Sequence, residues 1–344
     1  MPINFDAPVD PIDLTTFVRR VPTPDNLVLS QLFPAEVRDA MEVNFSEITK
    51  TNRAARFRAP DGRIHVADRD GADERVISMI PLSDSRNQGE YERLRRQMQR
   101  LGGTRTSALE QATYNDAEDL TRYVQNRAEL ALGDVLDDGA FSPDELTGVT
   151  VDYGMPVAHK ITSATSWGTA STDGFAQLIA AADVYEATNG ERPGFGITTR
   201  AEMRKLLKQT SLINAVKGAQ TGVTRISLAD TEDVFADEGL PTTWYVVETK
   251  IDYDGVTTPI IKPNKVILGP SNPADLLSFR YGTTATAMEL VDSGQVDFAF
   301  EDAPGIVGVT VKEGPPFREF TFVDALGIPL LKDARKLMTI TTEP

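Results

Sequence analysis

Residues 106–136 read TSALEQATYNDAEDLTRYVQNRAELALGDVL, and this stretch decides how the rest of the chain is interpreted. Its apolar side chains recur mostly at steps of three and four residues, the spacing of one face of an α-helix. They are Leu109, Ala112, Leu120, Tyr123, Val124, Ala128, Ala131 and Val135. At ~1.5 Å per residue this helix would be about 45 Å long, longer than a globular core of this size requires.

The residues before this helix predict that the helical region opens further upstream. Ser83-Asp84-Ser85 are good helix-capping residues, and the charged segment Glu90–Leu101 follows them. Gly102-Gly103 then interrupts the pattern.

Residues 48–82 predict a long, arginine-rich β-hairpin. Thr49–Ala59 forms one limb, Pro60-Asp61-Gly62 a turn, and Glu74–Ile80 runs back. The hairpin has few large apolar residues, so it is either a solvated surface hairpin or an arm whose arginines meet carboxylates on a neighbouring subunit. The candidate contact residues are Arg53, Arg56, Arg58, Arg63, Asp68, Arg69, Glu74 and Arg75.

The first 47 residues are rich in proline, which disfavours long helices. We expect an extended arm with one short helix at Pro34–Val43, because proline suits the first turn of a helix. An arm with scattered apolar residues is expected to lie across another surface.

The second half predicts helices first and strands later, an α+β arrangement. Gly139 is placed to end the long helix, Asp173 to cap a helix over 174–188, and Thr199-Arg-Ala-Glu202 to open a helix through Lys208. A short helix is expected at Ser227–Ala236. The expected strands are Val149–Tyr153, Gly194–Thr198, Thr243–Thr249, Thr257–Ile261, Asn264–Gly269, Val296–Phe300, Ile306–Lys312, Phe317–Leu326 and Leu337–Thr341.

Composition narrows the function classes. Of the 344 residues, 40% are hydrophobic and 25% charged, which predicts a globular chain, and no apolar run is long enough for a transmembrane helix. The chain has no cysteine, so disulfides and thiolate chemistry are excluded, and its start lacks a secretory signal pattern, which predicts a cytoplasmic protein. A net charge of −16 argues against gripping nucleic acid along the whole surface, but not against enclosing it.

Few residues predict catalysis. There is no Walker phosphate loop and no Gly-x-Ser-x-Gly elbow, and we expect His65, His159, Trp167 and Trp244 to be structural. Three acidic clusters could bind a cation or serve hydrolysis, or could simply be solvated or intersubunit faces. They are Asp134/Asp137/Asp138, Asp230/Glu232/Asp233/Asp237/Glu238 and Asp292/Asp297/Glu301/Asp302.

Two pairs of segments carry a resemblance. Asn264–Gly269 precedes Phe279-Arg-Tyr-Gly-Thr-Thr284, and Gly314–Thr321 precedes Gly327-Ile-Pro-Leu-Leu-Lys332. With the proline-rich arm, basic hairpin and long helix before them, they resemble the major capsid proteins of tailed bacteriophages with the HK97 fold, of the lambda-like type with a separate scaffold. The resemblance covers nearly the whole chain.

The resemblance implies an HK97-like α+β fold with four parts. These are an N-terminal arm (1–47), an extended loop (48–82), a peripheral domain with a spine helix (83–165 and 291–326) and an axial domain (166–290 and 327–344). It implies hexamers and pentamers in an icosahedral shell around double-stranded DNA, with no enzyme activity, metal, cofactor or membrane. Because the arm begins at the initiator, a scaffolding protein would be a separate chain, as would a portal and any decoration protein.

Two alternatives remain: a nanocompartment shell of the encapsulin type, with the same fold, and a carboxylate-dependent hydrolase. Some capsids of the resembled family also link subunits covalently through a lysine in the extended loop. Here no lysine lies between Lys50 and Lys160, so we expect a shell held by non-covalent contacts.

Overall fold

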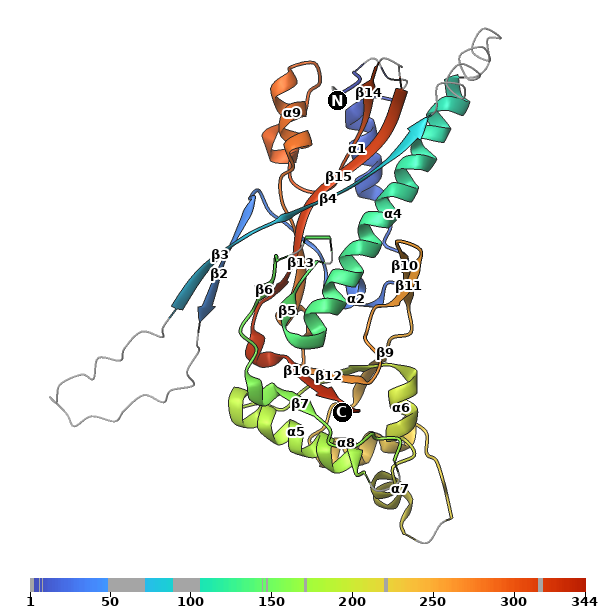
Figure 1. The fold of residues 1–344 in the computed structure, drawn as a ribbon, viewed down its shortest axis with the longest axis vertical. Helices are drawn as coiled ribbons and strands as arrows, with labels where there is room; N and C mark the ends of the chain where they lie inside the picture. Colours follow the sequence, from blue (N-terminus) through green and yellow to red (C-terminus); the bar gives the residue numbers. More distant parts are fainter. Residues whose placement is uncertain are drawn as a thin grey trace, which may run out of the picture.

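The computed structural model describes residues 3–5, 7, 9–48, 72–88, 106–143, 145–146, 148–169, 172–219, 222–314 and 318–344. The molecule is elongated, with one five-stranded sheet in its upper part, a second in its lower part, and a two-stranded β-ribbon that projects sideways (Figure 1). The helices are α1 (Pro11–Arg20), α2 (Val28–Leu32), α4 (Thr106–Asp138), α5 (Gly174–Asn189), α6 (Arg200–Leu206), α7 (Thr210–Lys217), α8 (Glu232–Asp237) and α9 (Ala285–Ser293).

The strands are short except for three that run through the upper part and two in the ribbon. They are β1 (Glu36–Val37), β2 (Glu42–Ile48), β3 (Ala72–Ser78), β4 (Ile80–Gln88), β5 (Ala140–Phe141), β6 (Val151–Asp152), β7 (Lys160–Thr162), β8 (Phe195–Thr198), β9 (Thr243–Val246), β10 (Lys250–Tyr253), β11 (Val256–Pro259), β12 (Lys265–Gly269), β13 (Leu277–Tyr281), β14 (Val307–Glu313), β15 (Arg318–Leu331) and β16 (Met338–Thr341). Single 3-10 turns lie at Val157–His159, Ala229–Thr231, Pro273–Asp275, Phe300–Asp302 and Ala334–Lys336.

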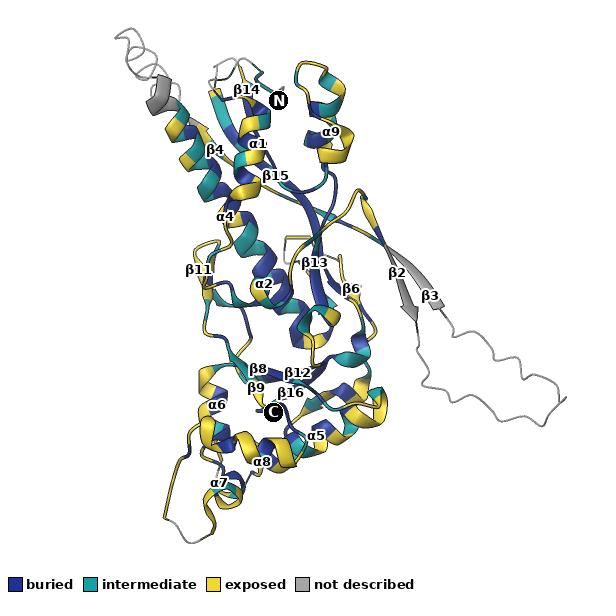
Figure 2. Cartoon of the chain, turned by 180° about the vertical axis from the view of Figure 1, so that it is seen from behind, coloured by how far each residue is buried: buried dark blue, intermediate teal, exposed yellow. Residues whose placement is uncertain are grey.

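The upper sheet is organised by β15, which has 14 residues and pairs with three other strands. It is antiparallel to β14, to β4 and to β13, with partners such as Val307↔Asp324, Ala325↔Leu82 and Leu277↔Leu331, and β1 adds parallel to β13. Helix α4 packs along this sheet with one buried face, while its other face is exposed (Figure 2). The buried side chains include Leu120, Val124, Leu132, Val135 and Leu136.

The lower sheet has the order β7-β16-β12-β8-β9. Helices α5 to α8 lie beneath it, at the end of the molecule opposite to α9 (Figure 1). Trp167, Phe175, Tyr185 and Phe235 fill a separate core there. A third, small core joins α9 to β14 in the upper part.

Several local predictions are confirmed. Helix α4 covers the predicted range and ends at Gly139, whose φ of +73° is the left-handed conformation that glycine adopts readily. The carboxylate of Asp173 accepts from the backbone N–H of Ala176 at the start of α5, and the hydroxyl of Thr199 does the same for Glu202 in α6. Trp167 is buried, as expected of a packing residue.

The prediction that helix begins at Ser83-Asp84-Ser85 is wrong. These residues belong to β4, where Ser83 pairs with Asp324 of β15 and Ser85 pairs with Phe322. A nine-residue ladder along β15 outweighs the weak helix preference of serine and aspartate. The charged segment Glu90–Leu101 lies outside the described residues.

The arm contains a helix that the proline content argued against. Helix α1 has Asp10 as N-cap and Pro11 in its first turn, so the prolines flank the helix instead of interrupting it. The predicted helix at Pro34–Val43 is wrong: the segment forms β1 and the start of β2, because β13 offers a free sheet edge to Glu36 and Val37.

The predicted strand at Val296–Phe300 is also wrong. Residues 296–299 form a loop, and Phe300 begins a 3-10 turn. The regular element in this region is α9, which Thr284 caps by accepting from the N–H of Ala287. Gly294, with a φ of +60°, ends it.

Candidate functional site: the assembly surfaces

The projecting ribbon is formed by β2 and β3, which pair from Glu42↔Ser78 to Ile48↔Ala72. It forms a sheet of its own and leaves the body beside the upper sheet (Figure 1). Of the predicted contact residues, the structure describes only the backbone of Glu74 and Arg75, which stand opposite Ser46 and Phe45. The other six lie outside the described residues: Arg53, Arg56, Arg58, Arg63, Asp68 and Arg69.

The root of the ribbon contacts the body through Ala40. The N–H of Met79 donates to the carbonyl of Met41 at 3.0 Å, which closes the base of the ribbon, and the N–H of Thr283 in the body donates to the carbonyl of Ala40 at 3.3 Å. A Cβ on Gly282 would lie 2.2 Å from the Ala40 oxygen, so only glycine permits this approach. The ribbon therefore leaves the body at a close backbone contact between Ala40 and Gly282.

Strand β4, which continues from the ribbon, is tied to α4 by Arg86. The guanidinium lies 2.9 Å from the carboxylates of both Asp116 and Asp119, and its Nη2 is 3.3 Å from the Tyr123 hydroxyl. These hydrogen bonds, chiefly that to Asp116, raise the pKa of Arg86. The contact is partly exposed, so it orients the two elements more than it stabilises them.

The N-terminal arm is joined to α4 through the fully buried Glu129. Its Oε1 accepts from the N–H of Leu29 at 2.7 Å, and its Oε2 accepts from the N–H of Ser30 at 2.7 Å. The N-cap position of α2, Leu27, offers no side-chain acceptor, so Glu129 caps this helix from another element. Burial raises the pKa of the Glu129 carboxyl, and these hydrogen bonds act in the opposite direction.

The other end of α4 is joined to the lower sheet. Asp137 lies 2.7 Å from the ammonium of Lys262 and 3.0 Å from that of Lys265 in β12. Burial opposes ionisation of Asp137, but the two lysines outweigh it and lower its pKa. Further along α4, a Cβ on Gly133 would lie 2.2 Å from the Ile260 oxygen, so the helix can approach this loop only at a glycine.

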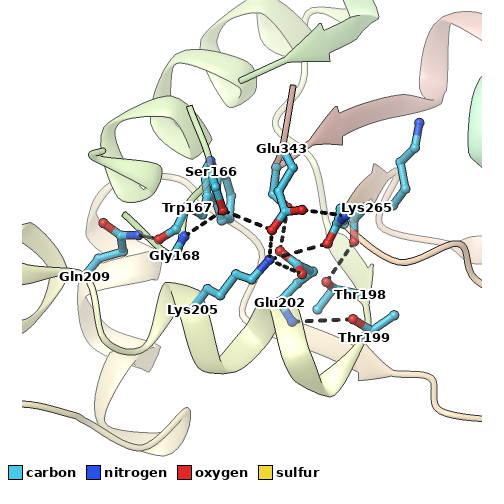
Figure 3. Close-up of polar contacts among 12 residues, drawn as sticks. Ser166, Trp167, Gly168, Thr198, Thr199, Glu202, Lys205, Gln209, Lys265 and Glu343 are labelled. Atoms are coloured by element: carbon cyan, nitrogen blue, oxygen red, sulfur yellow. Dashed lines mark hydrogen bonds and ion pairs between the residues drawn. The ribbon is translucent and has the colours of Figure 1, made fainter. Parts of the chain in front are cut away.

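A polar network fixes the C-terminal strand segment to α6 in the lower part (Figure 3). The buried carboxylate of Glu202 accepts from the Thr342 hydroxyl at 2.5 Å and lies 2.8 Å from the Lys205 ammonium. Lys205 also lies 2.6 Å from Glu343, which accepts from Asn264 at 2.8 Å. Each carboxylate in this network has hydrogen-bond donors, so it is a structural clamp.

Within the described residues, no group of three or more His, Cys, Asp or Glu side chains is arranged to hold a metal ion, so none of the three acidic clusters forms a metal site there. The carboxylate of Asp137 forms ion pairs with Lys262 and Lys265. His159 is buried between the carbonyl of Leu337, 2.9 Å from Nδ1, and the hydroxyl of Thr188, 3.0 Å from Nε2. His65 lies outside the described residues.

Sequence reasoning missed the residues that join the elements. Glu129 has Gln125 and Gly133 four residues to either side, so its helix face resembles a solvent-exposed one. The sequence identifies Glu202 only as part of a capping box. No local signal identifies the partners of either residue, since Leu29 lies 100 residues and Thr342 140 residues away in sequence.

These contacts join the arm, α4 and the two sheets into one elongated body that carries the ribbon. The family model of phage major capsid protein E matches residues 11–298. The chain belongs to this family of phage capsid proteins. It is thus a structural protein of the virion shell and not an enzyme, and the predicted resemblance is confirmed.

Solved structures agree with an HK97-like capsid fold. A prophage protein of Escherichia coli CFT073, described as a capsid protein, has a TM-score of 0.59 at 14% identity, covering 97% of this chain and 99% of that one. A phage-related protein from Bordetella bronchiseptica RB50 has a TM-score of 0.56 at 14% identity, with 97% of each chain covered. At such identities the likeness concerns the fold alone. No curated protein matches the capsid chain.

Proposed function

We propose that this capsid protein assembles into hexamers and pentamers of an icosahedral shell that encloses double-stranded DNA. The observation that carries the proposal is the β2–β3 ribbon, a two-stranded sheet of its own whose base meets the largest core through Val43 and Ile77. A two-stranded hairpin is marginally stable by itself in water. Contact with a neighbouring copy would supply the packing that the ribbon lacks.

The arginines of the extended loop are the proposed partners of carboxylates on neighbouring copies. Arg53, Arg56, Arg58, Arg63, Arg69 and Arg75 stand close in sequence to Asp68 and Glu74, so reciprocal pairing between loops is available. Mixed charge of this kind favours protein–protein contacts over DNA binding.

The proposed parts are the arm (1–47), the extended loop (48–82), a peripheral domain (83–165 and 291–326) and an axial domain (166–290 and 327–344). The strand pairing and packing change these bounds at two places. Strand β13 and helix α9, which begin within 166–290, go with the peripheral domain, because they pack in the upper part with β14 and β15. Strand β7, which lies within 83–165, goes with the axial domain, because it pairs with β16.

The net charge of −16 supports a wall that does not adhere to the nucleic acid it encloses. Assembly in the host cytoplasm with a separate scaffolding protein, a portal and a decoration protein is part of the proposal. Among the described residues, no helix combines the length and apolar character needed to cross a bilayer.

Electron microscopy of particles from cells that make this protein with its neighbouring gene products tests the proposal. Closed shells with hexameric and pentameric capsomers and nuclease-protected double-stranded DNA are expected. Shells filled with protein instead of DNA would support the nanocompartment alternative, which the family match disfavours. A chain that stays monomeric with all partners present would contradict the proposal.

A further inference from the structure

A cavity of about 630 Å³ in the lower part of the molecule is lined by three cationic side chains and one carboxylate. Arg204, Lys205 and Lys208 line it, together with Trp167 and Asp173. Lys205 is neutralised by Glu202 and Glu343. Arg204 and Lys208 are exposed and form no ion pair within the described part of the chain, so two cations remain available.

The start of α7 adds to the positive potential of this cavity, since Thr210 and Ser211 belong to its lining. The N-cap residue Gln209 places no acceptor on the first turn; its amide donates instead to the Trp167 carbonyl at 2.7 Å. Asp173 accepts from the Ala176 N–H and the Ser211 hydroxyl, so its negative charge offsets part of this potential. The groups left to attract a carboxylate are the two exposed cations, Arg204 and Lys208.

The same end of the molecule carries the complementary surface on α8. Glu232, Asp233, Asp237 and Glu238 are all exposed, and none forms an ion pair among the described residues. Asp233 and Asp237 are four residues apart on the helix, a spacing at which like charges destabilise it. The helix is therefore an anionic surface that gains from an external cation.

We propose that the acidic surface of α8 docks into the Arg204–Lys208 cavity of a second copy of this chain. This inference rests on the proposed function, in which many copies of this chain contact one another. Each surface repels its own kind, so the contact joins two different surfaces, and such heterologous contacts can close into rings. The partner of the lower part of the molecule is therefore a second copy of the same chain.

Charge exchange tests the proposal in the full-length chain. Arg204→Glu with Lys208→Glu, and separately Asp233→Lys with Asp237→Lys, should each lower the yield of assembled particles by at least about tenfold, the loss expected when close charge pairs become repulsive. Combining all four substitutions should restore the yield to within about twofold of the unmodified protein. All variants should keep the unmodified circular dichroism spectrum.

The control Arg20→Glu with Lys250→Glu changes the net charge equally on exposed residues outside the cavity. It should assemble normally; an equal loss would overturn the proposal, because net charge alone would explain the effect. Failure of the four-fold variant to recover would also overturn it. If Arg204→Glu with Lys208→Glu then abolishes binding of a short oligonucleotide, the cavity is a phosphate site instead.

Sedimentation velocity at low and high salt separates this inference from the proposed function. Salt-sensitive self-association that follows the same charge-exchange pattern without closed shells would support the contact and contradict the shell. Normal shells from every variant would support the shell and overturn the contact.

Discussion

Glu129 and Ser30 form a two-point contact between the spine helix and the N-terminal arm: one carboxylate oxygen accepts from the Ser30 N–H at 2.7 Å and from its hydroxyl at 2.5 Å. The same carboxylate accepts from the N–H of Leu29. A single buried side chain therefore decides where a short helix begins almost one hundred residues earlier in the chain.

Substitution Glu129→Gln should lower the free energy of unfolding by about 1–3 kcal/mol, because an amide NH₂ group would face a backbone donor that has lost its acceptor. Denaturant titration followed by circular dichroism measures this. The control Glu118→Gln removes only an exposed pair with Arg122 on the same helix and should cost at most about 0.5 kcal/mol. Equal effects of the two would show that Glu129 does not hold the arm.

The buried His159 predicts a loss of stability in mild acid. Burial lowers the pKa of its imidazole, which stacks on Tyr185, while the Leu337 carbonyl and Asp333 oppose that shift. As the pH falls through 6.5, the unfolded chain binds a proton that the folded chain resists, so the free energy of unfolding decreases. The slope contributed by one histidine reaches at most about 1.4 kcal/mol per pH unit.

Substitution His159→Gln keeps hydrogen-bonding capacity but removes this titration. Unfolding free energies measured from pH 8 to pH 5 should therefore fall less steeply for the variant than for the unmodified protein. Parallel curves would mean that His159 does not resist protonation.

Replacing Gly133 by alanine should lower the stability of the protein, although helix propensity alone would predict an increase. Alanine is about 1 kcal/mol better than glycine inside a helix. Its Cβ would nevertheless lie 2.2 Å from the Ile260 oxygen, so Gly133→Ala should destabilise the protein by about 1–3 kcal/mol. Thermal unfolding measures this, with Gly168→Ala as the control, since its new Cβ meets no atom closer than 3.5 Å. A stabilised Gly133→Ala would disprove the packing argument.

Charge reversals in the extended loop should prevent assembly without changing the fold of the single chain. Arg56→Glu or Arg63→Glu should block shell formation and leave helix content unchanged, since breaking a partly buried ion pair costs roughly 3–5 kcal/mol and the shell repeats that cost at every copy. Electron microscopy and circular dichroism together measure the two effects. Arg20→Glu, on the exposed end of α1, is the matched control. Normal shells from both loop variants would exclude the loop as an assembly contact.

The lack of lysine between Lys50 and Lys160 predicts a shell without covalent links through the extended loop. A guanidinium stays protonated at ordinary pH and cannot act as the amine nucleophile. Mature particles boiled in detergent and reductant should give one band at the chain mass of 37.6 kDa. A ladder of multimers would contradict the inference.

The sequence by itself determined the elements whose causes are local. The three- and four-residue spacing of apolar side chains specifies α4, and Gly139 ends it; Asp173 and Thr199 begin α5 and α6 through caps that lie within four residues of their partners. The capsid resemblance rested on the order of the proline-rich arm, the basic hairpin and the long helix, followed by the segments at 264–269, 279–284, 314–321 and 327–332.

Only the tertiary structure decided the elements whose causes are distant. Ser83-Asp84-Ser85 became a strand because β15 offered a ladder, and Glu129 became a cap because the arm folds back onto α4. Gly133 is required because a loop more than a hundred residues later crosses the helix there. Local preferences are worth tenths of a kcal/mol per residue, whereas a buried hydrogen bond or close contact is worth about one or more, so the long-range partner prevails.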